Sequence, residues 1–124
     1  LIQQCGGYKG KPKKLISGRP MRVIAQYTYE IPVLKGTSGI LILDDQKDYE
    51  ERRCIKCAKC VDVCPMNLMP NMIMATAKKD MVDSSKEMGA LDCFECGCCT
   101  YVCPAKIPLV HYIKYAKSEL AKKK

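Results

Sequence analysis

Apolar and polar positions change their spacing near residue 46. Before it, short apolar runs occur at KLIS, MRVIAQYTYEIPVL and GILIL, with turn signals at Ser17-Gly18 and Lys35-Gly36 between them. Such runs between turns are typical of strands. The opening LIQQCGG is typical of the last turn of a helix closed by two glycines, so we expect the chain to begin inside a domain. Residues 1–45 are therefore predicted to be β-rich.

Helical spacing dominates after the charged connector DDQKDYEER. Pro70 fits the first turn of a helix through NMIMATAKK, and Asp80 is predicted to cap a second, short helix that Gly89 ends. A helical stripe, with apolar residues four, three and four apart, consists of Leu109, Ile113, Ala116 and Leu120. The second half is thus predicted to be helical.

Two cysteine runs lie within this helical half. The strings CIKCAKCVDVCP, residues 54–65, and CFECGCCTYVCP, residues 93–104, share the same cysteine spacing and both end in proline. Corresponding positions are offset by 39 residues, as in 93 − 54 = 39. The repeat indicates an internal duplication with pseudo-twofold symmetry. It relates the pairs Cys54/Cys93, Cys57/Cys96, Cys60/Cys99 and Cys64/Cys103.

Iron–sulfur ligation explains this spacing better than its two rivals. The short chain has no recognisable signal peptide, which favours a reducing compartment and disfavours disulfides. Structural zinc sites take cysteine pairs from separate segments, whereas each run here has three cysteines in one loop. A loop with a cysteine at every third residue can wrap a 4Fe–4S cubane. We therefore predict two clusters.

The fourth cysteine of each run is predicted to bind the other run's cluster, as in two-cluster ferredoxins. The predicted ligands of the first cluster are Cys54, Cys57, Cys60 and Cys103. Those of the second cluster are Cys93, Cys96, Cys99 and Cys64.

Three further residues of this region carry expectations. Gly97 lets the backbone approach the second cluster closely, whereas Ala58 at the equivalent position must avoid a positive φ or carry mild strain. Cys98 is expected not to be a ligand.

The tenth cysteine, Cys5, is expected to be a small buried residue. The clustered methionines are expected to pack in the core.

Composition limits the remaining functions. The 124 residues carry a formal charge of +8, concentrated in YKGKPKK and the final lysines, and no apolar stretch is long enough to span a membrane. A basic surface suits an acidic partner, nucleic acid or anionic lipid, or is simply solvated. No paired acids, nucleophile–base pair or phosphate-binding loop is present, so no catalytic residue is predicted and the chain is expected to relay electrons.

A family resemblance rests on the strings CIKCAKCVDVCPMNLMP, GALDCFECGCCTYVCPAKIPLVHYIKYAK and KGTSGILIL. They resemble the C subunit of Rnf-type complexes, which are membrane-bound, ion-translocating ferredoxin:NAD oxidoreductases. The resemblance covers nearly the whole chain. Two departures are the segment SGRPMRV and Ala58, which replaces an expected glycine. Neither departure affects a predicted ligand.

The resemblance implies an α+β protein. Residues 1–45 would be the closing half of a β-grasp domain of the soluble-ligand-binding type, and residues 46–124 an α-helical, two-cluster 4Fe–4S ferredoxin-like domain. The subunit would lie in the cytoplasm on the inner face of the cell membrane. FMN and NAD would bind an upstream domain, and the partners would be other subunits of the complex, with ferredoxin as a further candidate.

Other classes stay open at this stage. A dicluster subunit of a heterodisulfide- or succinate-type reductase shares the cysteine runs, although its first segment usually differs. A structural zinc module or a nucleic-acid binder would use the thiols or the basic ends differently. Tyr8, Tyr27 and Tyr29 are too scattered in the sequence to form a face on which bases could stack.

Overall fold

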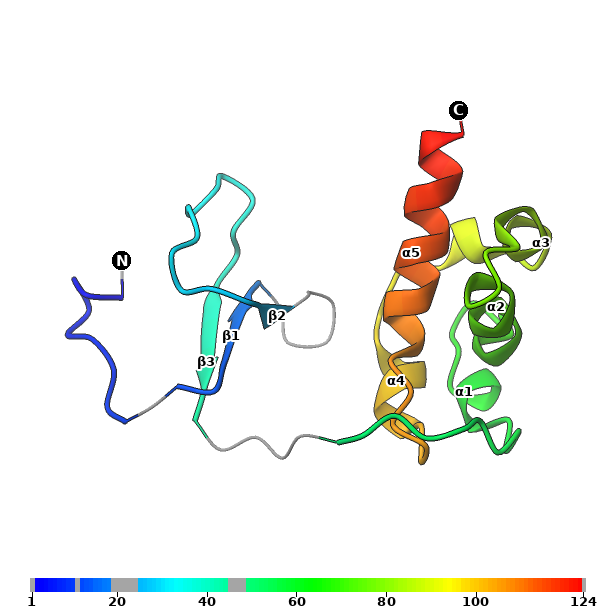
Figure 1. Cartoon of the computed structure of the whole chain (residues 1–124), viewed down its shortest axis with the longest axis horizontal. Coiled ribbons are helices and arrows are strands. Elements are labelled where there is room, and N and C mark those ends of the chain that lie inside the picture. The colour runs from blue at the N-terminus through cyan, green and yellow to red at the C-terminus, as the bar shows by residue number, and fades with distance from the viewer. Residues whose placement is uncertain (1, 11, 19–24, 45–48, 124) are drawn as a thin grey trace. The chain divides into compact units, whose positions relative to one another are not determined.

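The computed structural model describes residues 2–10, 12–18, 25–44 and 49–123. It divides into two compact units, Leu1–Asp48 and Tyr49–Lys124, which we call the β unit and the helical unit (Figure 1). Together they give a small α+β structure. Each unit is described below by itself.

A three-stranded antiparallel sheet forms the β unit. Its strands are β1 (Lys14–Ser17), β2 (Ala25–Gln26) and β3 (Ile40–Leu43), in the order β2-β1-β3. The central strand β1 buries Leu15 and Ile16. Two predicted strands, KLIS and GILIL, are confirmed. Of the described part of MRVIAQYTYEIPVL only β2 is a strand, and residues 19–24, with most of SGRPMRV, lie outside the described residues.

The helix-end geometry predicted for LIQQCGG is confirmed. The N–H of Gly7 donates to the carbonyl of Ile2 at 3.0 Å, and that of Gly6 donates to Gln3 at 3.2 Å. Both glycines have a left-handed backbone, with φ of 96° for Gly6 and 77° for Gly7. This pair of bonds is the Schellman motif, which satisfies carbonyl groups at the end of a helical turn.

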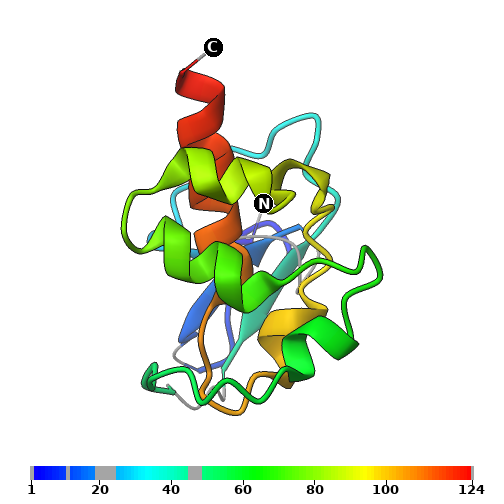
Figure 2. The ribbon, with the colours of Figure 1, turned by 90° about the vertical axis from the view of Figure 1, so that its right-hand side faces the viewer.

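The helical unit consists of short helices packed on one long helix (Figure 2). The long helix α5 (Leu109–Lys122) contacts α2 (Pro70–Ala77) and α3 (Val82–Glu87). Near its start, α1 (Lys59–Asp62) packs against α4 (Cys98–Val102), and a 3-10 turn, η1 (Ala90–Asp92), precedes the second cysteine run. The predicted stripe is confirmed, because all four of its residues are buried: Leu109, Ile113, Ala116 and Leu120.

The ends of the short helices confirm two predictions and correct one. Pro70 is the first residue of α2, and Gly89, with φ of 78°, follows the end of α3. Asp80 does not cap α3, because Met81 precedes its first residue. Asp80 instead has a left-handed backbone, with φ of 55°, and its carboxylate accepts a hydrogen bond of 2.8 Å from the hydroxyl of Tyr115. The side chain is thereby drawn to α5.

Within the described ranges, no helix is both long enough and apolar enough to cross a lipid bilayer. The longest, α5, has 14 residues and carries several lysines.

Candidate metal centre

The two cysteine runs form loops with the same backbone conformation. Left-handed residues recur at matched positions 39 apart: Lys56 and Glu95 have φ of 55° and 63°, and Ala58 and Gly97 have φ of 60° and 88°. In each loop the latter residue directly precedes a short helix, α1 or α4, that carries the third cysteine of the run. The internal duplication read from the sequence therefore extends to the backbone.

Four cysteines from separate parts of the sequence line one cavity. Three of them come from the first run, and Cys103 comes from the end of the second run. The wall is completed by apolar groups that include Pro104, Ile107 and Leu109. The four cysteines are the set predicted for the first cluster: Cys54, Cys57, Cys60 and Cys103.

Electrostatic interactions link the thiols in the same groups. Burial raises the pKa of the Cys60 thiol, and the nearby Cys54 and Cys103 raise it further. In the other group, burial raises the pKa of the Cys93 thiol, and the nearby Cys64 raises the same pKa further. Each of these interactions joins members of a single predicted set.

Among the described thiols, Cys99 has the pKa that is raised furthest. Burial raises its pKa to about 11, and Cys93 and Cys96 contribute in the same direction. Protonated thiols are thus favoured at this position in the protein alone. Bound iron would reverse the preference, because a coordinated thiol is deprotonated.

Backbone groups already point at the sulfur atoms. The N–H of Leu68 donates to Cys64 Sγ and the N–H of Glu95 donates to Cys93 Sγ, both at 3.4 Å. A backbone hydrogen bond from Asn71 likewise reaches Cys60 and favours its thiolate. Such N–H···S bonds stabilise the negative charge of a thiolate ligand.

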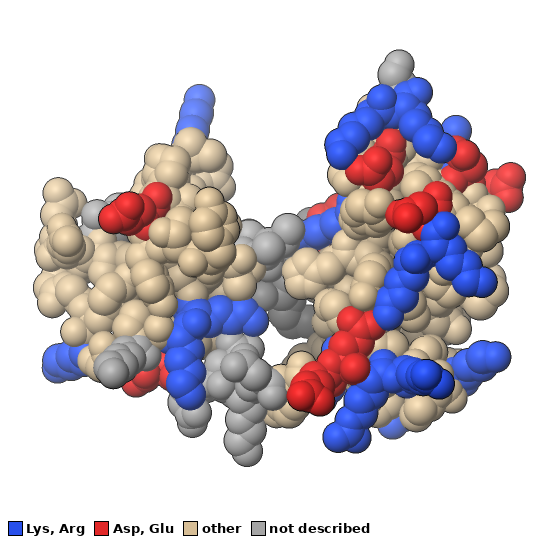
Figure 3. Space-filling view, in the orientation of Figure 1, with Lys and Arg blue, Asp and Glu red and all other residues tan. Residues whose placement is uncertain are grey.

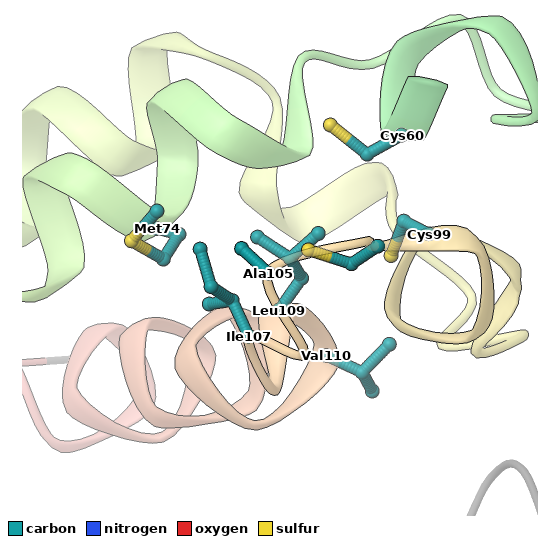
Figure 4. Packing of buried hydrophobic residues seen from close by; sticks show 8 residues of the cluster. Cys60, Met74, Cys99, Ala105, Ile107, Leu109 and Val110 are labelled. Carbon is teal, nitrogen blue, oxygen red and sulfur yellow. The ribbon is translucent and has the colours of Figure 1, made fainter. Parts of the chain in front are cut away.

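The thiols lie against an apolar core. Cys60 of α1 and Cys99 of α4 lie toward one end of a buried cluster, and Met74 of α2 lies toward the other (Figure 4). The remaining members of that cluster are Cys103, Ala105, Ile107, Leu109 and Val110. Low polarity around thiolates is one of the features by which proteins set the potential of iron–sulfur centres.

The methionines correct an expectation. Of the six that cluster in the sequence, only Met74 is buried, and Met88 is half-buried. Four are between 43% and 50% exposed: Met66, Met69, Met72 and Met81. Core packing therefore accounts for Met74 and in part for Met88, which packs against the cluster of Ile73, Ala90 and Ile113, whereas the other four lie at the surface.

A contact that sequence reasoning missed holds the second loop to α5. The ammonium group of Lys117 donates to the Cys93 carbonyl and to Glu95 Oε1, both at 2.9 Å. Lys114 lies 3.6 Å from the other carboxylate oxygen. Burial raises the pKa of Glu95, but the hydrogen bond and charge of Lys117 and the charge of Lys114 outweigh it, so the net pKa is lowered.

The two leftover cysteines differ from each other. Cys98 is half-buried beside the second set, and a side-chain hydrogen bond with Cys96 raises its pKa. Cys5 is exposed, so the expectation of a buried residue is wrong.

No three histidine, cysteine, aspartate or glutamate side chains within the described ranges are grouped so that they could hold one metal ion. Four cysteines line a common cavity instead. A cubane takes its four thiolates on four different iron atoms, so its ligands surround a volume and do not meet at a point.

Ala58 has a left-handed backbone, with φ of 60°, and so carries the mild strain that the sequence comparison with Gly97 indicated. A left-handed alanine costs about 1–2 kcal/mol, partly offset in a glycine variant by the greater entropy of its unfolded chain. We therefore expect Ala58→Gly to stabilise the protein by about 0.5–1 kcal/mol, and Gly97→Ala to destabilise it by a similar amount or more. Anaerobic urea unfolding of the cluster-loaded protein measures both.

The exposed helical position Ala75 supplies the matched control, because the same substitution should have the opposite sign there. Ala75→Gly is expected to cost about 1 kcal/mol through lost helix propensity. If Ala58→Gly and Ala75→Gly lowered the free energy of unfolding by equal amounts, the backbone strain at Ala58 would be contradicted.

Residues 46–104 match the model of the 4Fe–4S dicluster domain family. That segment contains both cysteine loops and every predicted ligand. The match therefore gives the class of this segment, which is that of the 4Fe–4S dicluster domains.

Comparison with curated proteins gives the particular relatives. The C subunit of the proton-translocating ferredoxin:NAD(+) oxidoreductase complex of Clostridium ljungdahlii is 49% identical over 121 residues, covering 95% of this chain and 26% of the relative. The C subunit of an ion-translocating oxidoreductase complex from Methanosarcina acetivorans is 47% identical, covering 100% and 28%. The Na(+)-translocating counterpart of Acetobacterium woodii is 48% identical, covering 97% and 28%.

The chain is thus homologous, over its whole length, to a segment of the C subunit of ion-translocating oxidoreductase complexes, and the resemblance predicted from its sequence is confirmed. It spans about a quarter of the length of these curated relatives.

Proposed function

We propose that this chain is the electron-relay segment of the C subunit in a membrane-associated, ion-translocating ferredoxin:NAD oxidoreductase complex. The observation that carries the proposal is the pair of matched cysteine loops inside a dicluster domain, one of which shares a cavity with the last cysteine of the other. The relatives over the whole chain support the same function, because all are named as C subunits of ion-translocating oxidoreductase complexes, two of them ferredoxin:NAD(+) oxidoreductases.

The residues present fit two 4Fe–4S clusters. Cys54, Cys57, Cys60 and Cys103 would hold one, since their side chains line one cavity of thiol and apolar groups. Cys93, Cys96, Cys99 and Cys64 would hold the other, since Cys93 interacts with Cys64 and Cys99 interacts with both Cys93 and Cys96. Each bound cluster supplies reversible one-electron exchange.

Other groups of the chain stabilise the ligand thiolates, exclude water from them and hold the second loop in place. Backbone N–H groups of Leu68 and Glu95 donate to ligand sulfurs and so stabilise their negative charge. Buried Ile107 and Leu109, each 1% exposed, exclude water from one side of the first set. Lys117 holds the second loop through the Cys93 carbonyl and places a positive charge beside that set.

We also propose a larger setting, which rests on the resemblance of the sequence to the C subunit of Rnf-type complexes. The β unit would be the closing half of a soluble-ligand-binding β-grasp domain, and FMN and NAD would bind a domain upstream of it. The subunit would be peripheral on the cytoplasmic face of the membrane. Its partners would be the other redox subunits, with ferredoxin as a further electron donor or acceptor. The helical unit would connect flavin to these partners.

Reductive titration tests the relay. Protein with reconstituted clusters should bleach near 400 nm and take up about two electrons per chain from dithionite, one for each cubane. NADH alone should leave the spectrum unchanged. Uptake of no electrons by iron-loaded protein, or bleaching by NADH without added flavoprotein, would contradict the proposal.

A further inference from the structure

The two duplicated loops carry opposite charge. From Arg52 to Lys59 the first loop reads RRCIKCAK, with four basic residues and no acidic one. The equivalent second stretch, 39 residues on, reads LDCFECGC, with two acidic residues and no basic one. Two basic residues of the first loop thus have acidic counterparts, because Arg53 corresponds to Asp92 and Lys56 to Glu95. The duplication has kept the backbone and inverted the charge.

The first loop is the more exposed of the two. Every residue from Tyr49 to Lys59 is exposed, including Cys54 and Cys57, and Ile55 at the tip is 66% exposed. In the second loop, Cys93, Cys96 and Glu95 are half-buried and Gly97 is buried. Thiols of the first set therefore reach the surface beside an exposed apolar side chain.

The basic residues of the first loop lack internal compensation. Among the described residues, no ion pair is formed by the side chains of Arg52, Arg53, Lys56 or Lys59. The second loop differs, because its Glu95 is paired with both Lys114 and Lys117 of α5. The preceding Glu51 is occupied by Lys78 and Tyr112 and is not free to neutralise the first loop.

A further lysine extends this basic surface. The N–H of Arg52 donates to the Ala105 carbonyl at 3.0 Å, which holds the approach to the first loop against the chain after α4. Lys106 follows directly, exposed, with its ammonium group 4.8 Å from the centre of the Tyr49 ring. Figure 3 shows Lys and Arg side chains gathered at the end of the helical unit where Figure 1 places the loops beside α1 and α4.

We propose that this basic surface, formed by Arg52, Arg53, Lys56, Lys59 and Lys106 around Ile55, is the docking site for an acidic redox protein. The inference rests on the proposed relay and adds which cysteine set faces the partner. An exposed apolar residue surrounded by uncompensated like charges suits a partner with complementary acidic residues around its own redox centre. Docking here brings that centre next to the exposed thiols of the first set.

Bound clusters do not remove the contrast between the loops. A cubane with four thiolate ligands carries a charge of roughly −2, which leaves the four-cation first loop positive. The second loop has two acids, so its cluster adds to a negative charge that Lys114 and Lys117 offset only in part. The first loop stays attractive to an acidic surface, whereas the second stays repulsive.

The test exchanges the charge of the first loop for that of the second. Arg53→Asp with Lys56→Glu introduces the residues that already occupy the equivalent positions, and Glu95 shows that glutamate adopts the left-handed backbone required at Lys56. The control, Lys79→Glu with Lys86→Glu, makes the same change in net charge at exposed positions after α2 and in α3. The probe is an acidic bacterial ferredoxin, and its dissociation constant is measured by calorimetry.

We expect the loop variant to weaken ferredoxin binding at least tenfold at about 0.01 M salt, where charges act over roughly 30 Å, and the control to weaken it less than threefold. The difference should shrink as salt is added. Carbodiimide, which joins lysines to carboxylates in contact, should link ferredoxin to Lys56 and Lys59 in preference to Lys79 and Lys86. These two readouts do not depend on electron transfer.

Equal weakening by the two variants, or cross-links spread over all four lysines, would overturn the docking site. If the wild-type protein holds its iron and sulfide in that experiment, the relay itself stands. Protein without clusters after reconstitution would overturn both. A loop variant that loses affinity for duplex DNA but keeps its affinity for ferredoxin would assign the surface to nucleic acid and overturn this proposal.

Discussion

Cys103→Ser is expected to remove the first cluster and leave the second in place. The iron content should fall from about eight to about four per chain, with acid-labile sulfide falling in parallel, because each cubane holds four of each. The physical reason is the shared cavity, in which Cys103 joins three cysteines that precede it by 43 to 49 residues. Iron and sulfide assays on anaerobically purified protein measure the effect.

Double variants test the crossed assignment itself. Cys54→Ser with Cys103→Ser should still hold about four irons, because both changes affect one cluster. Cys54→Ser with Cys64→Ser should hold almost none, because each change affects a different cluster. The reverse outcome would show that each run binds its own cluster. Cys98→Ser is the matched control in the second loop and should keep about eight irons.

Ile113→Ala has the second largest expected effect. Ile113 is 1% exposed on α5 and packs with Ile73 and Ala90, which come from α2 and η1. Truncating an isoleucine at such a position leaves a cavity and costs about 2–5 kcal/mol. Anaerobic guanidinium unfolding of the cluster-loaded protein, followed by circular dichroism at 222 nm, measures the free energy of unfolding.

A graded series makes this result specific. Ile113→Val should cost about 0.5–1.5 kcal/mol, since it removes one methylene group. Leu91→Ala removes a large side chain that is 47% exposed and should cost under about 1 kcal/mol. If Ile113→Ala and Leu91→Ala lowered the free energy of unfolding by similar amounts, the packing of α5 in the core of the helical unit would be contradicted.

Much of the helical unit could be predicted from local rules. Pro70 begins α2 because proline suits the first helical position, and the stripe on α5 is buried because its spacing matches the helical period. The repeated cysteine spacing likewise predicted two loops of one design. The matched left-handed residues at 56/95 and 58/97 agree with that prediction.

Other features could not be predicted, because they depend on contacts between distant residues. Asp80 has the composition of a helix cap, but its side chain bonds Tyr115, 35 positions away. Lys117 lies on a polar face of α5, and nothing in its neighbours indicates that it bonds the Cys93 carbonyl. Residues 27–34 continue an apolar run whose composition suits a strand, but they form none.

The most direct test of the account combines iron and acid-labile sulfide analysis with electron paramagnetic resonance of anaerobically purified, dithionite-reduced protein. Two clusters held by the eight cysteines predict about eight irons and eight sulfides per chain and a spectrum broadened by interaction between two reduced cubanes. Stoichiometric zinc without sulfide, in protein from iron-replete cells, would contradict the account and leave a structural metal module.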